Sequence, residues 1–192
     1  MVPPASLRPI VAAPRTAIAP VRRPRVDPSE VASRLAPAVH WPGGLDSETR
    51  SWRLMARTAD FDAWLIAWPR GGKVELHDHG TSTGAVSVIS GVLVESVPWR
   101  DDTGQLSLVR HELHAGATLG FGGGHVHDVT NESDGHALSL HVYSPALTSM
   151  TFYELSGGQL VVRDVAWSAD GSGEFEHGME EVDSRVKAAA VR

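Results

Sequence analysis

Two histidines one residue apart, His77 and His79, have a spacing that could serve metal chemistry. They lie in a stretch that predicts a β-strand, and alternate residues of a strand point to the same face. Two strand rises separate their backbones by about 7 Å, which lets both imidazoles reach one metal ion. Pairs of surface histidines that bind nothing share this spacing. The pair alone therefore indicates only a candidate metal site.

The residues after the pair resemble the first motif of the cupin superfamily. That motif has two histidines one residue apart, four or so residues, a glutamate, six residues and a glycine. Here His79 is followed by four residues and Gly84, and then by six residues and Gly91. The spacing matches, and Gly84 stands where cupins have the glutamate.

A second stretch resembles the second cupin motif and contributes a third histidine. Gly116 is followed by five residues and a triple glycine over 122–124, and His127 and then Asn131 come after it. Only the first of the three glycines departs from the motif, because proline is usual there. His125 is a rival ligand, since it would share a strand face with His127. The spacing of the motif favours His127, and Asn131 can cap the following turn.

Three neutral imidazoles suit iron, copper, zinc or nickel on ligand softness alone. The residue that discriminates is Gly84, because glycine cannot coordinate and the ion then keeps its full charge and several open positions. An iron ion held on one face by His77, His79 and His127 is suited to binding a substrate and dioxygen together. The set therefore favours an oxygenase.

Polar residues alternate along the predicted strand 137–143. Ser139, His141 and Tyr143 share one face, and apolar residues occupy the other. Such a triplet is costly against a dry core unless each group finds a partner, so its natural place is the lining of a polar pocket. The alternative is a strand whose polar face meets solvent.

The triplet continues into Ser144-Pro145, and together with the two histidine motifs it resembles the cysteine dioxygenase family over about residues 50–155. The resemblance implies non-haem Fe(II) held by the three histidines, beside a hydrogen-bond network of Ser139, His141 and Tyr143. It implies addition of dioxygen to the sulfur of L-cysteine, giving cysteine sulfinic acid. It also implies a cis bond between Ser144 and Pro145.

In that family an arginine before the barrel holds the substrate carboxylate. Arg53 and Arg57 both precede the strand over 62–68, and Arg53 fits the family pattern better. A planar guanidinium meets a carboxylate with two hydrogen bonds. A related subgroup that oxidises 3-mercaptopropionate has glutamine there, so an arginine favours cysteine. The alternatives are a dioxygenase for that or another small thiol, and a non-catalytic metal-binding cupin.

One position departs from the animal members of the family. They carry a cysteine, cross-linked to the tyrosine of the triplet, where this chain has Gly84. Many bacterial members resemble this sequence in having glycine there. The chain contains no cysteine, so no thioether can form and Tyr143 is expected to be a free phenol.

Short strands must position these residues. Alternating or apolar runs separated by Gly, Pro, Asn and Asp predict nine strands: 63–68, 73–79, 85–97, 106–113, 118–121, 126–130, 137–143, 150–155 and 159–165. They predict an all-β fold, which the resemblance makes a small, jelly-roll-like antiparallel cupin β-barrel. Short N-terminal helices are expected over 28–35 and around 48–56.

The two ends differ in composition from the strand-rich part. Residues 1–28 hold seven of the twelve prolines and five arginines, and we expect a disordered tail because so few large apolar groups cannot offset the ordering entropy. We expect the thiol-dioxygenase domain over 29–167. An acidic C-terminal tail follows over 168–192, with a helix near 180–190.

Charge and composition narrow the partners. The net charge is −6, and an acidic body argues against a nucleic-acid surface, which needs clustered cations. No run of about 18 apolar residues predicts a membrane span. The lack of cysteine excludes disulfides, zinc–thiolate sites and iron–sulfur clusters. We expect a cytoplasmic monomer whose partners are a small thiol and dioxygen.

Overall fold

The computed structural model describes residues 26–41 and 48–167. The predicted C-terminal tail with its helix, and nearly all of the predicted N-terminal tail, lie outside these ranges. The described elements are α1 (Pro28–Leu35), the 3-10 helix η1 (Ala36–Ala38), β1 (Ser51–Arg57), β2 (Asp62–Trp68), β3 (Lys73–Asp78), β4 (Thr83–Ser90), β5 (Val92–Arg100), β6 (Leu106–His114), β7 (Thr118–Phe121), β8 (His127–Thr130), β9 (Ala137–Ser144), β10 (Ser149–Ser156) and β11 (Gln159–Trp167).

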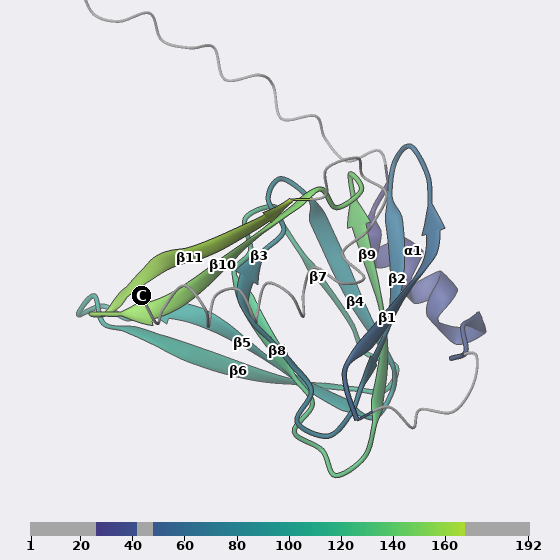
Figure 1. Cartoon of the computed structure of the whole chain (residues 1–192), viewed down its shortest axis with the longest axis horizontal. Coiled ribbons are helices and arrows are strands. Elements are labelled where there is room, and N and C mark those ends of the chain that lie inside the picture. Colours follow the sequence, from purple (N-terminus) through teal and green to yellow (C-terminus); the bar gives the residue numbers. More distant parts are fainter. Residues whose placement is uncertain (1–25, 42–47, 168–192) are drawn as a thin grey trace, which may run out of the picture.

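The strands form two antiparallel sheets that face each other (Figure 1). One sheet has the order β1-β2-β9-β4-β7, and the other has the order β11-β10-β3-β8-β5-β6. The prediction of an all-β, antiparallel barrel is therefore confirmed. Within the described ranges, no helix is long and apolar enough to cross a membrane.

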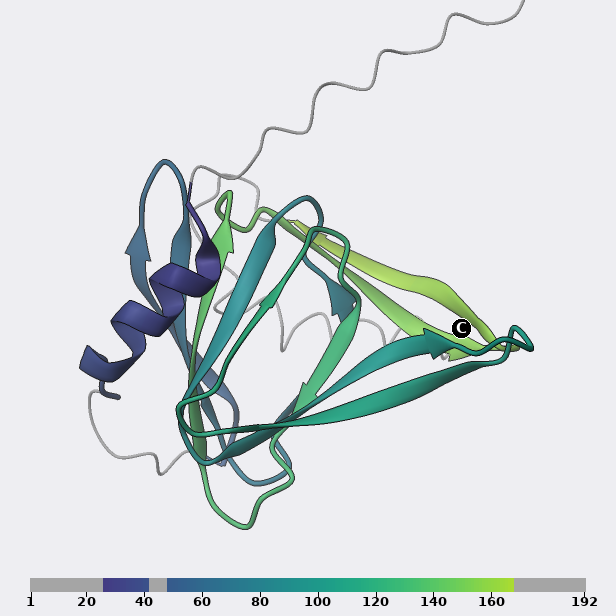
Figure 2. The ribbon, with the colours of Figure 1, turned by 180° about the vertical axis from the view of Figure 1, so that it is seen from behind.

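The helix α1 covers the outer face of the first sheet (Figure 2). It begins at Pro28, as predicted, because the Asp27 side chain caps it by accepting a hydrogen bond from the Ser29 backbone at 2.8 Å. Its Ala32 packs with Leu140 and Val142 of β9 in one buried cluster. The first sheet is thus covered on its outer face, which leaves its inner face for the site.

Strand alternation divides β9 between these two faces. Its apolar residues 138, 140 and 142 belong to the clusters on the helix side. Ser139, His141 and Tyr143 point the other way, and all three are buried. The prediction that the polar triplet lines the interior rather than meeting solvent is therefore confirmed.

Two predicted elements are wrong. The stretch expected as a helix around 48–56 contains β1, an edge strand that pairs antiparallel with β2. The single strand expected over 85–97 is two strands, β4 and β5, which turn at Gly91. That residue has a φ of +76°, and a Cβ there would lie 2.8 Å from the Cα of Ala137. Only glycine fits both conditions.

Asn131 closes the loop after β8. Its side-chain oxygen accepts a hydrogen bond from the Ser133 backbone at 3.0 Å, which confirms the predicted cap. Its amide nitrogen donates to the carbonyl oxygens of Trp68, Pro69 and Gly135. This fully buried residue therefore ties the end of β8 to the end of β2.

Candidate metal centre and active site

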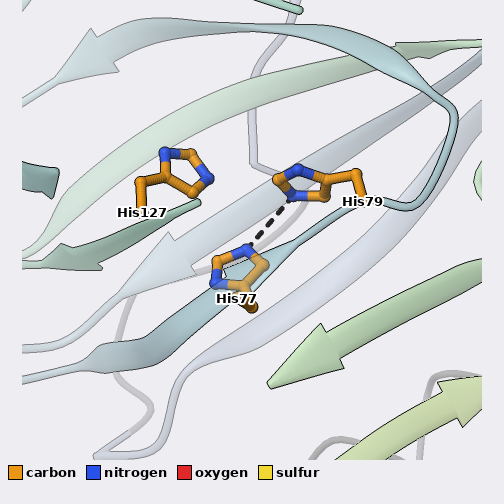
Figure 3. A group of neighbouring side chains, drawn as sticks. All are labelled: His77, His79 and His127. Carbon is orange, nitrogen blue, oxygen red and sulfur yellow. Dashed lines mark hydrogen bonds between the residues drawn. The ribbon is translucent and has the colours of Figure 1, made fainter. Parts of the chain in front are cut away.

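His77, His79 and His127 come together inside the barrel (Figure 3). His77 lies on β3 opposite His127, the first residue of β8, and His79 directly follows β3. One ring nitrogen from each histidine lies within 4.8 Å of those from the other two. All three are at most 3% exposed. Pairing of β3 with β8 thus converts two distant sequence motifs into one cluster.

The contacts and burial of His77 and His79 suit metal ligands. His77 Nδ1 lies 2.7 Å from the backbone oxygen of Glu75, which can only accept, so Nδ1 carries the proton and Nε2 a lone pair. His77 Nε2 in turn lies 3.1 Å from His79 Nε2. Burial, and then neighbouring histidines, hold the pKa values of His77 and His79 well below the usual range. Neutral imidazoles that share a buried space in this way fit a transition-metal ion.

His125 does not join this cluster. Its side chain is 26% exposed, whereas that of His127 is 2% exposed. His125 instead lies with Glu95 and His127 in a second group of possible ligand atoms. Of the two candidates, the structure therefore brings His127 together with His77 and His79.

The polar triplet of β9 forms a chain of hydrogen bonds. Ser139 Oγ lies 2.9 Å from His141 Nε2, and His141 Nδ1 lies 3.3 Å from the Tyr143 hydroxyl. Trp68 Nε1, which can only donate, donates to Ser139 Oγ at 2.8 Å. The Ser139 hydrogen is then directed to His141, and His141 donates to the oxygen of Tyr143. This direction leaves the Tyr143 hydroxyl hydrogen available to a ligand in the cavity.

Both titratable members of the chain are neutral at physiological pH. Burial, and then the electrostatic effects of His127 and Arg50, lower the pKa of His141 to about 3. Burial, and then the charge of Asp62, raise the pKa of the Tyr143 phenol above its usual value. Tyr143 therefore keeps its proton and acts as a hydrogen-bond donor rather than as a phenolate.

A cavity of about 50 Å³ lies beside the histidines, between the two sheets. His77, His127, His141 and Tyr143 give it one polar side. The remaining lining is Arg50 and the apolar residues Trp52, Trp64, Ile66, Trp68, Val74, Val129, Leu147 and Met150. A cavity of this size and polarity suits a small molecule with one anionic end.

The arginine in this cavity is Arg50, not Arg53. Arg53 is exposed, and Arg57 is bonded to the buried Asp62 at 3.2 Å; neither lines the cavity. Arg50 donates to the Lys73 backbone oxygen at 2.9 Å, and its guanidinium lies over the rings of Trp52 and Trp68. Arg50 therefore occupies the place in the cavity that was expected for Arg53, and the binding of a substrate carboxylate by either arginine stays a prediction. On an extended chain, Arg50 and Trp52 share the inner face, and Arg53 takes the outer one.

Phe121 occupies the space beside Gly84. A Cβ on Gly84 would lie 2.5 Å from two ring atoms of Phe121 and 3.0 Å from Tyr143 Cδ1. Register explains the crowding, because Gly84 pairs with Phe121 of β7 on one side and with Tyr143 of β9 on the other. A side chain at position 84 therefore requires the Phe121 ring to move.

This crowding predicts a cost for Gly84→Ala. Overpacking of a filled site costs about 1–3 kcal/mol, so the free energy of unfolding should fall by that amount. Gly122→Ala is the matched control, because a Cβ there meets nothing within 4 Å. Urea unfolding of both variants measures the difference. Equal stability of the two variants would show that Phe121 yields freely.

Sequence reasoning did not identify three residues of the site: Arg50, Glu95 and Phe121. Glu95 carries the clearest signal that it failed to use, because it is a carboxylate inside the apolar run of β5. Arg50 was hidden by the helix expected around 48–56. Phe121 has no sequence signal, since its role depends on packing. The Ser144–Pro145 bond is cis, as the resemblance implied.

Several solved structures are similar to this chain. A recombinant oxalate oxidase in complex with glycolate is 18% identical, with a TM-score of 0.47, over 57% of this chain and 58% of that one. A protein of Thermus thermophilus is 22% identical, with a TM-score of 0.43, over 54% and 90%. A cupin superfamily protein of Desulfitobacterium hafniense is 14% identical, with a TM-score of 0.43, over 57% and 86%. The chain thus spans little more than half the length of the oxalate oxidase.

The family comparison covers more of the chain. The family described as "Cysteine dioxygenase type I" matches residues 5–156. The match includes all three clustered histidines, the triplet of β9 and Arg50, and it agrees with the resemblance carried by the sequence motifs. The chain belongs to the cysteine dioxygenase type I family.

Proposed function

We propose that this protein is a non-haem Fe(II) thiol dioxygenase that adds dioxygen to the sulfur of L-cysteine and yields cysteine sulfinic acid. The observation that carries the proposal is the cluster of His77, His79 and His127, of which His77 and His127 line a cavity that also holds Arg50 and Tyr143. Membership of the family supports the same reaction class.

The reaction balances without a further reductant. The O–O bond breaks, two S–O bonds form, and the electrons lost by sulfur reduce the same dioxygen molecule. The thiol proton ends on the sulfinic acid or in solvent. A site that binds one thiol and one dioxygen is therefore sufficient, which agrees with the small size of the cavity beside the histidines.

Iron held by the three histidines would supply positions for thiolate and dioxygen and would lower the pKa of the thiol. Arg50 would bind the substrate carboxylate through its planar guanidinium. The Trp and aliphatic walls would exclude water, which strengthens each of these polar contacts. Tyr143 would donate its hydroxyl hydrogen to charge that develops on oxygen, while His141 and Ser139 hold its direction.

Replacement of the donor tests this role. Tyr143→Phe should lower kcat by about 100-fold, the usual loss when one donor to developing charge is removed. Iron content should stay at the wild-type value, because Tyr143 is not among the clustered nitrogen donors. The thermal unfolding midpoint should fall only slightly, because the buried His141 Nδ1 loses its acceptor. An unchanged kcat would remove Tyr143 from the mechanism.

A second candidate substrate is 3-mercaptopropionate. The described lining of the cavity includes an arginine but no carboxylate, so it offers no acidic partner to the ammonium group of cysteine. A thiol with a carboxylate and no amine would meet this lining at no such cost. If L-cysteine is the substrate, its amine would instead bind at the metal that the three histidines would hold.

Oxygen uptake decides between these substrates. Iron-loaded protein with L-cysteine should give a higher kcat/KM than with 3-mercaptopropionate. The reverse order would assign the enzyme to the second thiol. Consumption of neither would favour a non-catalytic metal-binding cupin. The cytoplasmic location, the monomeric state and the absence of nucleic-acid or membrane partners stay predictions.

A further inference from the structure

Glu95 is a charged residue in the buried part of β5. It is 3% exposed, and its neighbours Leu93 and Val94 belong to the hydrophobic core. A carboxylate without partners in such a place costs several kcal/mol, so its contacts must offset that cost. These contacts connect Glu95 to the cluster of His77, His79 and His127.

Two histidines meet Glu95. His127 Nδ1 lies 2.7 Å from its Oε1, and His125 Nε2 lies 3.0 Å from the same oxygen. The strands explain the arrangement, because Glu95 on β5 pairs with Val129 on β8, two residues from His127 and on the same face. A carboxylate oxygen accepts hydrogen bonds, so at these distances each ring can donate from the nitrogen that faces Glu95.

We propose that Glu95 is a positioning residue for the metal centre, which fixes His127 with its proton on Nδ1 and its Nε2 directed to the ion. A histidine that donates to a carboxylate is held in one tautomer and is a more basic ligand. The proposal also assigns a source of negative charge to a site whose cupin glutamate is replaced by Gly84. It rests on the proposed metal site but not on the substrate.

Glu95, His125 and Phe121 form an outer layer, by which we mean residues that contact the clustered histidines without belonging to the cluster. The Phe121 ring stacks on His79 at 5.1 Å and on His125 at 5.3 Å between centroids. His125 is therefore linked to two proposed ligands. It stacks on Phe121, which stacks on His79, and it lies within hydrogen-bond distance of Glu95, which contacts His127. In this arrangement His125 helps to hold His79 and His127 in place and is not itself a ligand.

A different use of the same atoms is an ion held directly by Glu95, His125 and His127, whose ligand atoms also lie within 4.8 Å of one another. His127 would then bind that ion through Nδ1, and its Nε2 would not be a ligand. The two arrangements differ in what His77 does. In ours, His77 is a ligand; in the other, it is not.

Cobalt(II) binding to the full-length protein tests the proposal without the enzymatic reaction. Glu95→Gln keeps the size of the side chain but removes its charge, and it should weaken cobalt affinity about 10- to 100-fold in competition with a chromophoric chelator. Glu154→Gln, at an exposed position of β10, is the matched control and should bind as the wild type does. Thermal unfolding of the metal-free proteins shows whether both variants are folded.

Three outcomes would overturn the proposal. The first is wild-type cobalt affinity in a folded Glu95→Gln protein. The second is full cobalt affinity in His77→Ala, which would place the ion at the other group. The third needs no variant: nitrogen-15 NMR of the metal-free wild type should find His127 protonated on Nδ1, and protonation on Nε2 would contradict it. Loss of affinity in Glu95→Gln, together with no oxidation of either thiol by iron-loaded wild type, would keep this inference and remove the proposed function.

Discussion

His77→Ala is expected to abolish both iron retention and thiol oxidation. The variant keeps only two of the three clustered nitrogen donors. It also loses the contact between His77 Nε2 and His79 Nε2, which lie 3.1 Å apart, and leaves a space in place of the His77 ring. Loss of a partner outside the ligands costs about 10- to 100-fold in metal affinity, so loss of a ligand itself should exceed about 100-fold. Iron per chain after gel filtration, and oxygen uptake with L-cysteine, measure the two effects.

His114→Ala is the control for this experiment. His114 is the last residue of β6, is exposed and pairs with Val92 rather than with Glu95 or a clustered histidine, so iron content and rate should match the wild type. A fully active, fully loaded His77→Ala protein would contradict the account. It would transfer the metal to Glu95, His125 and His127, the other group with ligand spacing.

Arg50→Ala is expected to lower kcat/KM for L-cysteine roughly 100-fold, mainly through KM. The reason is the loss of charge-assisted hydrogen bonds to the carboxylate, each worth about 1.5–3 kcal/mol. Arg50→Lys should fall between the wild type and Arg50→Ala, because it keeps the charge but not the planar pair of donors. Steady-state oxygen uptake over a range of cysteine concentrations gives both constants.

Arg50 also donates to the Lys73 carbonyl and packs on Trp52 and Trp68, so a general disturbance of the cavity must be separated from loss of binding. Cysteamine, an aminothiol without a carboxylate, separates them, since its kcat/KM should be the same in wild type and Arg50→Ala. Arg53→Ala is the matched control and should behave as wild type. A larger loss in Arg53→Ala than in Arg50→Ala would restore the assignment that the sequence favoured.

Strand alternation is the part of the site that the sequence could predict. It placed His77 and His79 on one face, and Ser139, His141 and Tyr143 on another, because a period of two fixes the direction of each side chain. These expectations needed only the right element at the right residues. The spacing of glycines then distinguished His127 from His125.

Arg50 was not predicted as a cavity residue because the wrong secondary structure was expected around it. The expectation that an arginine lines the cavity was itself correct. Residues 48–56 were expected as a helix, and on a helix the alternation of Trp52, Arg53 and Leu54 has no meaning. As an edge strand, the same residues point alternately in and out, which exposes Arg53. Pairing with β2 decides this conformation, and local propensity does not report such a long-range contact.

The outer layer of the site could not be predicted for a related reason. Phe121 stacks on His79 only because β7 pairs with β4 beside Gly84. Glu95 reaches His127 only because β5 pairs with β8 in one particular register. Register is a property of the assembled sheets, and a shift of one residue would turn each of these side chains to the opposite face.

Product analysis with isotopically labelled dioxygen tests the central claim most directly. Iron-loaded protein and L-cysteine should give cysteine sulfinic acid in which both new oxygen atoms carry the label, and activity should scale with iron content. This result would mean that dioxygen supplies both new oxygen atoms and that the reaction needs iron. A sulfinate with one unlabelled oxygen, a disulfide as the only product, or full activity without iron would contradict the account.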